Sequence, residues 1–236
     1  MRLSCICRLS PFVIKGTIGY YVKMKFKVDL HVHSLYSEDN YADPEEMVLR
    51  AIELKLDGLA FTEHYSYAAS GYIGELKEKY GGLLRIFRGV EFSGAEGHCL
   101  IFGVDTDSLL SKHAPVEDIS RIVNKAGGVV IPSHPYRKGT SLGDLILTVQ
   151  GICALEGHNG CNMPSYNAQA VEAAKNRNLP YTGGSDAHSP EEVGSCYTEF
   201  DDEVTDDNFI HLLRQGRYQG IDTRPRAFFS RIRARE

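Results

Sequence analysis

Two histidines stand two residues apart in the stretch VDLHVHSLYSED, which runs over residues 28–39. Asp29, His31 and His33 alternate with apolar residues, so on a β-strand their side chains point to one face. Neighbours on one face of a strand are roughly 6.6 Å apart, and two imidazoles can meet one cation at bonds of about 2.1 Å. A strand with a polar, solvated face has the same pattern, so this spacing alone leaves both interpretations open.

A second pair with this spacing, Asp186 and His188, follows the letters GGS near the end of the chain. Glu91 lies in an apolar segment, where a carboxylate is costly unless it is paired or binds a cation. Three more histidines flank apolar segments, although each also fits an ordinary cap, core or turn position: His64, His98 and His134. Such ligands suit zinc, manganese or iron. They exceed what one ion needs, so we expect two or three ions that hold a hydroxide and grip both the attacking and the leaving oxygen.

Strands and helices that alternate with short connections must bring these side chains together. The sequence predicts strands at 26–33, 58–64, 83–94, 97–105, 129–135, 152–160 and 181–189. It predicts helices from residue 43, near 116–123, near 142–149, about 165–177 and near 206–215. In one unit after another, His, Asp or Glu follows the apolar strand, which is where α/β barrels carry their chemistry. We therefore predict a parallel, barrel-like α/β domain.

The first predicted helix has the clearest boundary signal. Asp43 is expected to cap it, and Pro44 is expected as its first residue. Leu49, Ile52 and Leu56 follow a helical spacing and predict the stripe that the helix buries.

Length and composition favour one globular domain. The chain has 236 residues, 42% of them hydrophobic, which is ample for a single α/β barrel. The net charge of −5 argues against a general nucleic-acid coat, and no apolar run approaches the ~20 residues of a membrane span. The six cysteines form no CxxC pair, and their scatter favours reduced thiols in the cytoplasm.

The two ends of the chain differ from the middle. Residues 1–24 fit the domain poorly, and Met24 just before KFKVDLHVHS suggests that the natural chain starts there. We therefore treat 1–24 as an N-terminal extension that need not be native and 25–222 as the single domain. Residues 223–236 are expected to form a basic, solvated tail with Arg224, Arg226, Arg231, Arg233 and Arg235.

Five segments, in order, resemble the motifs of the PHP (polymerase and histidinol phosphatase) phosphoesterases: DLHVHS, FTEH, GVEFSG with GHCLIFG, PSHP and GGSDAHS. The resemblance runs from about Lys27 to Gly216, and five ordered motifs are far more specific than any one. It implies a distorted (β/α)7 barrel of the TIM-like type, with a trinuclear metal centre at the C-terminal ends of its strands.

The resemblance also implies a role for each matching residue. The ligands would be His31, His33, Glu91 and Asp186 for a first ion, Glu91, His98 and His134 for a second, and Asp39, His64 and His188 for a third. Asp39 is preferred to Glu38, although some relatives carry the acid one residue earlier. Glu91, Asp186 and His188 are the residues to which we assign the catalytic role.

Supporting roles follow from position. Arg137 and Lys138, just after PSHP, are expected to grip a substrate phosphate, because a guanidinium fork matches phosphate oxygens; a solvated loop is the alternative. Glu156 and Asn159 lie at another strand end and are expected to line the substrate pocket.

Two acids are expected behind the ligands. Asp29 is expected to orient an imidazole by accepting its free N–H, with a simple strand-edge acid as the alternative. Glu63 in TEH replaces the commoner, shorter acid of this motif and is expected to support the ligands from behind.

The expected function is metal-dependent hydrolysis of a phosphate monoester or of a nucleotide or oligonucleotide phosphoester by a metal-bound hydroxide. The expected cofactors are two or three divalent ions of zinc, manganese or iron, and the expected partner is a small phosphorylated substrate, with no membrane and no obligate protein partner. No polymerase region follows and no large inserted domain is evident, which favours a stand-alone nucleotide phosphoesterase. A histidinol-phosphate phosphatase, a C–N hydrolase of the amidohydrolase type and a non-catalytic metal-binding module are the alternatives.

Overall fold

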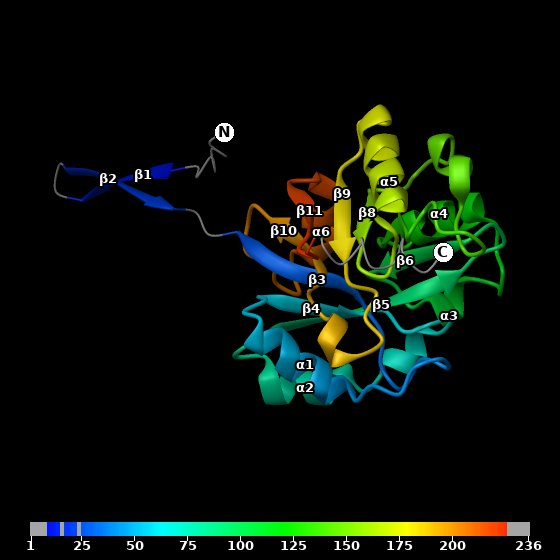
Figure 1. Ribbon diagram of the computed structural model, residues 1–236, viewed down its shortest axis with the longest axis horizontal. Helices are drawn as coiled ribbons and strands as arrows, with labels where there is room; N and C mark the ends of the chain where they lie inside the picture. The colour runs from blue at the N-terminus through cyan, green and yellow to red at the C-terminus, as the bar shows by residue number, and fades with distance from the viewer. Residues whose placement is uncertain (1–8, 15–16, 23–24, 226–236) are drawn as a thin grey trace.

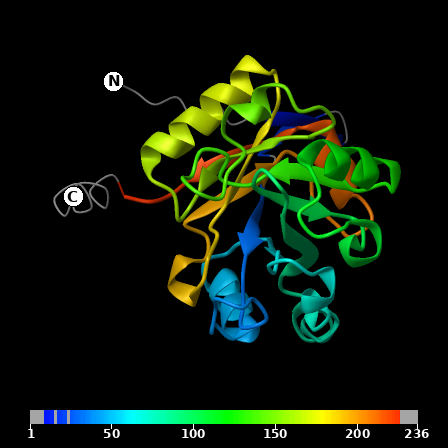
Figure 2. The same cartoon turned by 90° about the vertical axis from the view of Figure 1, so that its right-hand side faces the viewer.

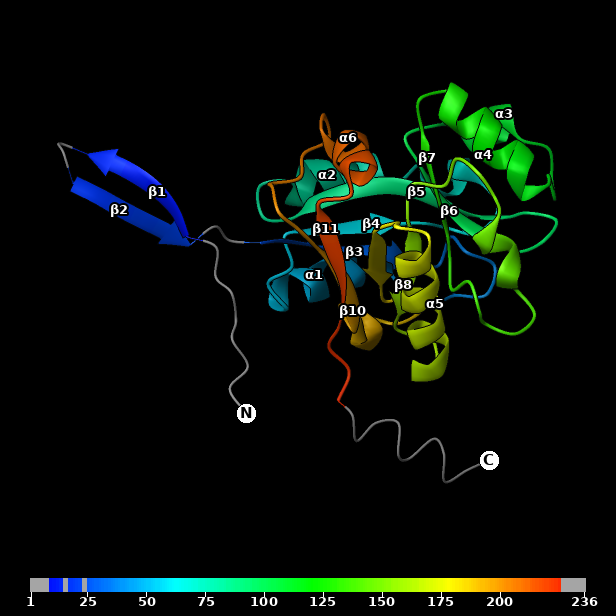
Figure 3. The same cartoon turned by 90° about the horizontal axis from the view of Figure 1, so that it is seen from above.

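The structure is a computed structural model that describes residues 9–14, 17–22 and 25–225 (Figure 1). Strands β1 (Leu9–Ile14) and β2 (Thr17–Val22) pair with each other in antiparallel fashion. Figure 3 shows this hairpin to one side of the other strands. Several expectations lie outside the described residues: the chain start at Met24, the thiols of Cys5 and Cys7, and the arginines beyond Arg224.

Seven strands form the main sheet in the order β11–β10–β3–β4–β5–β6–β7. Their bounds are Tyr218–Asp222 (β11), Cys196–Phe200 (β10), Phe26–Val32 (β3), Gly58–Phe61 (β4), Arg85–Ser93 (β5), His98–Phe102 (β6) and Val129–Pro132 (β7). Strands β8 (Leu155–Asn159) and β9 (Tyr181–Gly184) form a parallel pair. Strands β3, β4 and β5 are parallel, whereas β6 is antiparallel to β5 and β7, and β10 is antiparallel to β3 and β11.

This mixed sheet corrects the expectation of a parallel barrel. Only residues 94–97 separate β5 from β6, whereas a parallel crossover needs roughly a dozen residues or more. Strand β6 therefore returns beside β5 as a hairpin, with Ser93 opposite His98. As a result, the start of β6 lies at the edge of the sheet where β5 and β7 end.

Backbone hydrogen bonds curl these strands into a distorted, TIM-like barrel. Cys153 N donates to Val130 O at 3.0 Å and joins the entry of β8 to β7. Asp186 N donates to His31 O at 2.7 Å, and His33 N makes a neighbouring bond of 3.0 Å to the segment after β9. The α/β barrel-like fold is as predicted, and the residues that close it include the histidine pair of the first motif.

Helices lie around the outside of the curled sheet (Figure 2). They are α1 (Pro44–Glu53), α2 (Ile73–Tyr80), α3 (Thr106–Leu109), α4 (Val116–Lys125), α5 (Pro164–Asn176) and α6 (Phe209–Gln215). The helix expected near 142–149 is a five-residue 3-10 helix, Gly143–Leu147. Helix α2 and strands β10 and β11 did not follow from the sequence patterns.

Helix α1 begins as expected but buries a different face. The Asp43 carboxylate accepts a backbone N–H of the first turn at 2.7 Å. The buried residues are Met47, Val48 and Ala51, whereas Leu49 is 49% exposed. Successive helical residues are rotated by about 100°, so Leu49 points away from the face that the other three share. The predicted stripe was therefore wrong at this residue.

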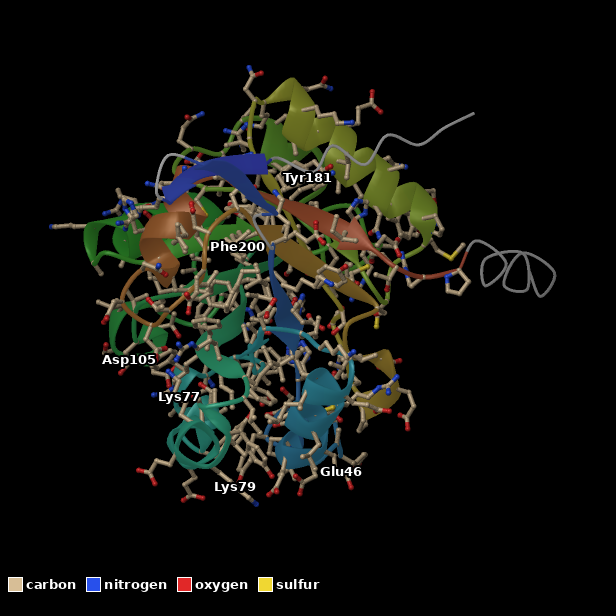
Figure 4. The ribbon with its side chains drawn as sticks, turned by 90° about the vertical axis from the view of Figure 1, so that its left-hand side faces the viewer. Glu46, Lys77, Lys79, Asp105, Tyr181 and Phe200 are labelled. Carbon is tan, nitrogen blue, oxygen red and sulfur yellow. The ribbon has the colours of Figure 1, made fainter. Side chains whose placement is uncertain are left out.

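Apolar side chains fill the space between sheet and helices, and charged side chains lie outside (Figure 4). Phe87 of β5 stacks on Phe209 of α6 with ring centroids 4.3 Å apart. Phe200 is buried on β10, whereas Glu46 of α1 and Lys79 of α2 reach into solvent. This distribution is ordinary for a globular domain, so the buried charges at the strand ends stand out.

The chain directly after β11 is still packed against the domain. The Arg224 side chain is only 7% exposed and lies 2.6 Å from a carboxylate oxygen of Asp222. It also donates to the backbone oxygens of Gly160 at 2.6 Å and Asn162 at 2.7 Å. Arg224 therefore anchors the chain, which corrects its assignment to a solvated tail.

No helix in the described part of the chain is long and apolar enough to cross a membrane. The four described cysteines are free thiols: Cys99, Cys153, Cys161 and Cys196.

Candidate metal centre

The nine predicted ligands lie at one edge of the curled sheet. Most follow the C-terminal end of a strand, as expected for this architecture. His98 is different, because it is the first residue of β6. The reversed direction of β6 brings its first residue to the edge where its neighbours end, so His98 still reaches the same site.

The first predicted group is compact and buried. The Nε2 atoms of His31 and His33 are 3.0 Å apart. Each lies 3.3–3.5 Å from one carboxylate oxygen of Asp186 and one of Glu91. Four ligands around one tetrahedral ion at bonds of about 2.1 Å would be separated by about 3.4 Å. The distances therefore fit one cation among these four side chains.

Glu91 faces a second group with its other oxygen. Oε1 lies 2.8 Å from His134 Nε2 and 3.4 Å from His98 Nδ1, whereas Oε2 faces the first group. Glu91 is 1% exposed, so its negative charge must be stabilised by neighbouring groups inside the protein rather than by water. A carboxylate with one oxygen toward each group is arranged to bridge two ions.

The third group lies toward the rim. Asp39 Oδ2 is 3.3 Å from His64 Nε2 and 3.6 Å from His188 Nε2. The ligand atoms of His33, His64 and His188 lie within 4.8 Å of one another, so His33 is shared between two groups. Glu38 instead lines a neighbouring cavity, so this geometry favours Asp39 over Glu38.

The electrostatics of the centre favour bound positive charge. Burial alone would raise the pKa of Glu91 and Asp186, but His31 and the other cationic neighbours outweigh burial and hold both well below their usual range. Burial opposes charge on His31 too, yet Asp186 and the other carboxylates raise its pKa well above the ordinary value. Burial lowers the pKa of His33, with further lowering by the imidazoles beside it. The buried carboxylates therefore need positive charge nearby. Protons on the imidazoles can provide only part of it, because charged imidazoles repel one another.

Hydrogen bonds orient three of the imidazoles. Glu156 Oε1 lies 2.8 Å from His31 Nδ1, and the Asp186 carbonyl lies 2.9 Å from His188 Nδ1. Both oxygens can only accept, so each Nδ1 carries a proton, and in the neutral ring Nε2 is then the nitrogen whose lone pair can bind a metal. These second contacts fix the tautomer that a metal ligand requires.

Ser37 performs the same task for His33. Its hydroxyl lies 3.3 Å from His33 Nδ1 and donates to Glu63 at 2.6 Å. Because the single hydroxyl proton goes to Glu63, the oxygen accepts from His33. Glu63 also accepts from the Ser34 hydroxyl at 2.6 Å and from Tyr72. Glu63 therefore lies behind the ligands, at the position where it was expected.

Unpaired nitrogens show that the donor set suits a metal. His64 Nδ1 and His98 Nδ1 are buried without a hydrogen-bond partner, yet they lie 3.1 and 3.4 Å from Glu91 oxygens. A cation placed between each of these nitrogens and the Glu91 oxygen next to it would interact favourably with both atoms. Zinc, manganese and iron accept these nitrogen and oxygen ligands.

Asp29 does not touch an imidazole. Its carboxylate accepts backbone N–H groups of Ser185 at 2.8 Å and Gly194 at 2.9 Å. Asp29 lies two residues before His31 on β3 and is therefore farther from the sheet edge. The donors that reach it there are backbone N–H groups of the segment after β9 and of the loop before β10. Burial raises the pKa of Asp29 to about 6, although these hydrogen bonds oppose the rise. The expected orienting contact is made by Glu156 instead.

Glu156 and Asn159 are buried rather than exposed to a substrate pocket, at 1% and 0%. Asn159 donates to Glu156 at 3.0 Å and to Asp186 at 3.2 Å. Both residues therefore position ligands, and the pocket-lining interpretation is corrected because their polar atoms already have protein partners.

Arg137 lies directly beside the first group. Its guanidinium donates to Asp186 at 2.7 Å, Asn159 at 2.7 Å and Asn162 at 2.8 Å, and its side chain is 28% exposed. Burial disfavours its charge, but Asp186 and the other acids raise its pKa above the ordinary value. Lys138 is exposed on the next position of the loop.

Sequence reasoning missed the supporting hydroxyl and amide groups. Ser133 donates to Glu91 at 2.7 Å, and Ser37 and Asn162 hold His33 and Arg137. The serines stood inside the quoted motifs, in HSLYS and PSHP, so motif position was the available signal. Asn162 carried no comparable signal.

A cavity of about 380 Å³ opens beside the centre. Its lining residues are Glu38, Tyr65, Phe92, Ser93, Lys112 and His113. The first three are direct chain neighbours of the ligands Asp39, His64 and Glu91, so the cavity adjoins the metal centre.

Solved structures with a similar fold come from several organisms. A two-domain protein from Bacteroides vulgatus that contains a predicted PHP-like metal-dependent phosphoesterase is 22% identical, with a TM-score of 0.68 over 84% of this chain and 65% of that one. PsfC from Pseudomonas syringae is 23% identical, with a TM-score of 0.66 over 89% and 98%. The lesion-specific endonuclease PfuEndoQ from Pyrococcus furiosus is 19% identical, with a TM-score of 0.63 over 86% and 60%. This chain thus spans about two thirds of the first protein.

No curated protein matches this sequence significantly. Family models do match it, one described as the PHP domain over residues 29–150 and one as PHP-associated over residues 164–218. The first of these matches covers more than half of the chain and contains most of the ligand positions. This chain therefore belongs to the PHP domain family.

Proposed function

We propose that the protein is a metal-dependent hydrolase of a phosphate monoester or of a nucleotide or short oligonucleotide phosphoester. The observation that carries the proposal is the bridging position of Glu91, whose two oxygens face separate ligand groups at one barrel edge. A multinuclear centre suits phosphoester hydrolysis, because charge develops on the attacking and leaving oxygens together.

Divalent ions in such a centre activate a water and neutralise charge on the phosphoryl oxygens. The protein's residues keep this arrangement fixed. Glu91 and Asp186 remain ionised, since their pKa values lie well below the usual range, with burial opposed by His31. Glu156 and Ser37 hold the first histidine pair in the tautomer that leaves Nε2 free. The site is thus prepared before substrate binds.

Arg137 is the proposed phosphate contact. Its guanidinium is partly exposed and already adjoins Asp186, so its charge lies next to the proposed reaction site. A planar fork with several donors can hold a carboxylate on one side and phosphate oxygens on another. Arg137 is also a positioning residue for Asp186, so its loss would affect both ligand geometry and substrate binding.

The adjoining cavity supports a nucleotide as the substrate. Tyr65 is 50% exposed, and its ring centroid lies 5.5 Å from that of His64. An exposed aromatic ring provides a stacking face for a base. Lys112 supplies a cation in the same cavity, and the Ser93 hydroxyl is buried without a hydrogen-bond partner. We therefore favour a substrate with a base and a second anionic group beyond the scissile phosphate.

Hydrolysis of a substrate panel tests this proposal. The panel contains nucleoside bisphosphates, short oligoribonucleotides, histidinol phosphate, a phosphotyrosine peptide, p-nitrophenyl phosphate and an amide as the C–N substrate, each with manganese, zinc or iron. The readout is inorganic phosphate for the monoesters and mononucleotide for the oligoribonucleotides. Wild type should hydrolyse the nucleotide members, and His33→Ala should not. Turnover of the amide with no hydrolysis of any phosphoester would overturn the proposal.

We also propose residues 25–224 as the functional domain, extended from 25–222 because Arg224 is anchored in the fold, and the cytoplasm as its location. Both family-model matches lie within that range, and the strands that close the barrel begin at Phe26. The free thiols of the described cysteines suit a reducing compartment.

A further inference from the structure

A second set of ligand-type side chains lies outside the nine-residue centre. Cys161, His188 and Glu192 each offer one atom, and these three atoms lie within 4.8 Å of one another. Cys161 and Glu192 are exposed, and neither belongs to the ligand groups of the centre. His188 belongs to both sets, so the two sites meet at one imidazole.

The two nitrogens of His188 face opposite sites. Nε2 lies 3.6 Å from Asp39 at the rim of the centre. Nδ1 lies 2.9 Å from the Asp186 carbonyl, and Cys161 Sγ lies 3.1 Å from the same oxygen. Nδ1 and Sγ therefore contact the same carbonyl oxygen. Glu192 accepts the His188 backbone N–H at 2.8 Å, which holds its carboxylate beside this residue.

Solvent reaches this outer set directly. A cavity of about 640 Å³ has Cys161, Ser189, Glu192 and Arg224 among its lining residues. This cavity is separate from the smaller one beside Tyr65. A hydrated ion can thus approach Cys161 without passing through the centre.

The chemistry of the set selects a thiophilic cation. Sulfur, nitrogen and carboxylate oxygen with one water make a tetrahedral zinc site. Cadmium shares this preference for thiolate, whereas manganese prefers oxygen and nitrogen. On binding, the Cys161 thiol releases its proton to water. The His188 proton moves through water from Nδ1 to Nε2, so the ring stays neutral and one proton is released in all.

We propose that Cys161, His188 and Glu192 form an outer binding site for zinc or another thiophilic divalent cation, and that its occupation inhibits the enzyme. A neutral imidazole has one lone pair, so His188 can serve the outer ion or the rim group with Asp39, but not both. An outer ion therefore removes a ligand from the centre. Cation binding is independent of the proposed function, whereas inhibition rests on it.

Cadmium titration of the full, manganese-loaded protein tests the binding step. The readout is the ultraviolet charge-transfer band of a thiolate bound to cadmium. Both proteins carry Cys5→Ser and Cys7→Ser, so that this cysteine pair contributes no band. In this background the chain with Cys161 should give the band, and Cys161→Ser should abolish it. Glu192→Gln should weaken binding by at least about tenfold, since even a lost supporting contact typically costs about 10- to 100-fold in metal affinity. Glu191→Gln, which alters an adjacent residue of the same cavity, is the matched control and should bind like wild type.

Zinc titration of manganese-supported phosphate release tests the consequence. Excess zinc should inhibit wild type, and Cys161→Ser should keep its manganese activity while resisting zinc by roughly tenfold or more. A band that persists in Cys161→Ser, or equal zinc inhibition of both proteins, would overturn the inference. If no phosphoester is cleaved but the band still depends on Cys161, the proposed function fails and the outer site stands.

Discussion

The inner ligands and the rim ligands of the metal centre differ in burial and in support. His31, His33, Glu91 and Asp186 are at most 2% exposed, and protein hydrogen bonds orient them from behind. At the rim, the side chains of Asp39 and His188 are 58% and 33% exposed. Ordering buried, pre-oriented ligands around an ion costs little free energy, whereas exposed ligands must lose bound water and conformational freedom. We infer that the inner positions bind ions tightly and that the rim position exchanges.

The largest effect is expected when Glu91, the residue common to the first and second ligand groups, loses its charge. Glu91→Gln should abolish phosphate release and lower metal content by at least one ion, because the amide cannot supply negative charge to two groups. Metal analysis of the purified protein after dialysis measures this. Glu203→Gln, an exposed acid, is the control. An unchanged metal content in Glu91→Gln would contradict the bridging assignment.

A smaller effect is expected behind the ligands. Glu156→Ala should lower inner-ion affinity by about 10- to 100-fold, because His31 loses the acceptor that fixes its tautomer. Glu156→Gln should recover part of the loss, since its amide oxygen still accepts that N–H. Competition with a calibrated chelator gives the affinities. Equal defects in both variants would mean that charge, rather than orientation, is what Glu156 supplies.

Substitutions at the rim should remove fewer ions than substitutions inside. His188→Ala and Asp39→Asn should each weaken one ion, whereas His33→Ala should also disturb the inner group. Stepwise chelation followed by metal counting separates these cases. Glu38→Gln is the matched control for Asp39→Asn, and a stronger defect in the control would move the ligand to Glu38.

The smallest effect is expected in the cavity beside the rim. Tyr65→Ala should raise KM for a nucleotide by about tenfold, which corresponds to the ~1–3 kcal/mol of one stacked base. The KM for p-nitrophenyl phosphate should stay unchanged, because that substrate is too short to reach the cavity. Equal changes for both substrates would indicate disturbed ligands rather than lost stacking.

The sequence predicted which residues gather at the barrel edge better than it predicted the residues that support them. His31, His33 and Asp186 lie in motifs at strand ends, so the order of the elements alone predicts that they meet. Support depends on contacts between distant segments: His31 meets Glu156, 125 positions away, and not Asp29 on its own strand. Local periodicity carries no information about which distant acid arrives behind a given imidazole.

Strand direction was predictable in part. The four residues between β5 and β6 exclude a parallel crossover, so connection length contained the signal for the hairpin. Strands β10 and β11 gave weaker signals. They are short, and Cys196–Phe200 buries only alternate residues, so its apolar pattern is sparse. Strand β10 is placed by pairing with β3, a contact across most of the chain, and β11 is placed by pairing with β10.

Anomalous diffraction from crystals grown with manganese, zinc or iron tests the central claim most directly. We predict at least two anomalous peaks, one on each side of the Glu91 carboxylate. The first should be ligated by His31, His33 and Asp186, and the second by His98 and His134. A third, weaker peak is expected between Asp39 and His188. A single peak that does not contact Glu91, in crystals of active protein, would contradict the bridged centre on which the account rests.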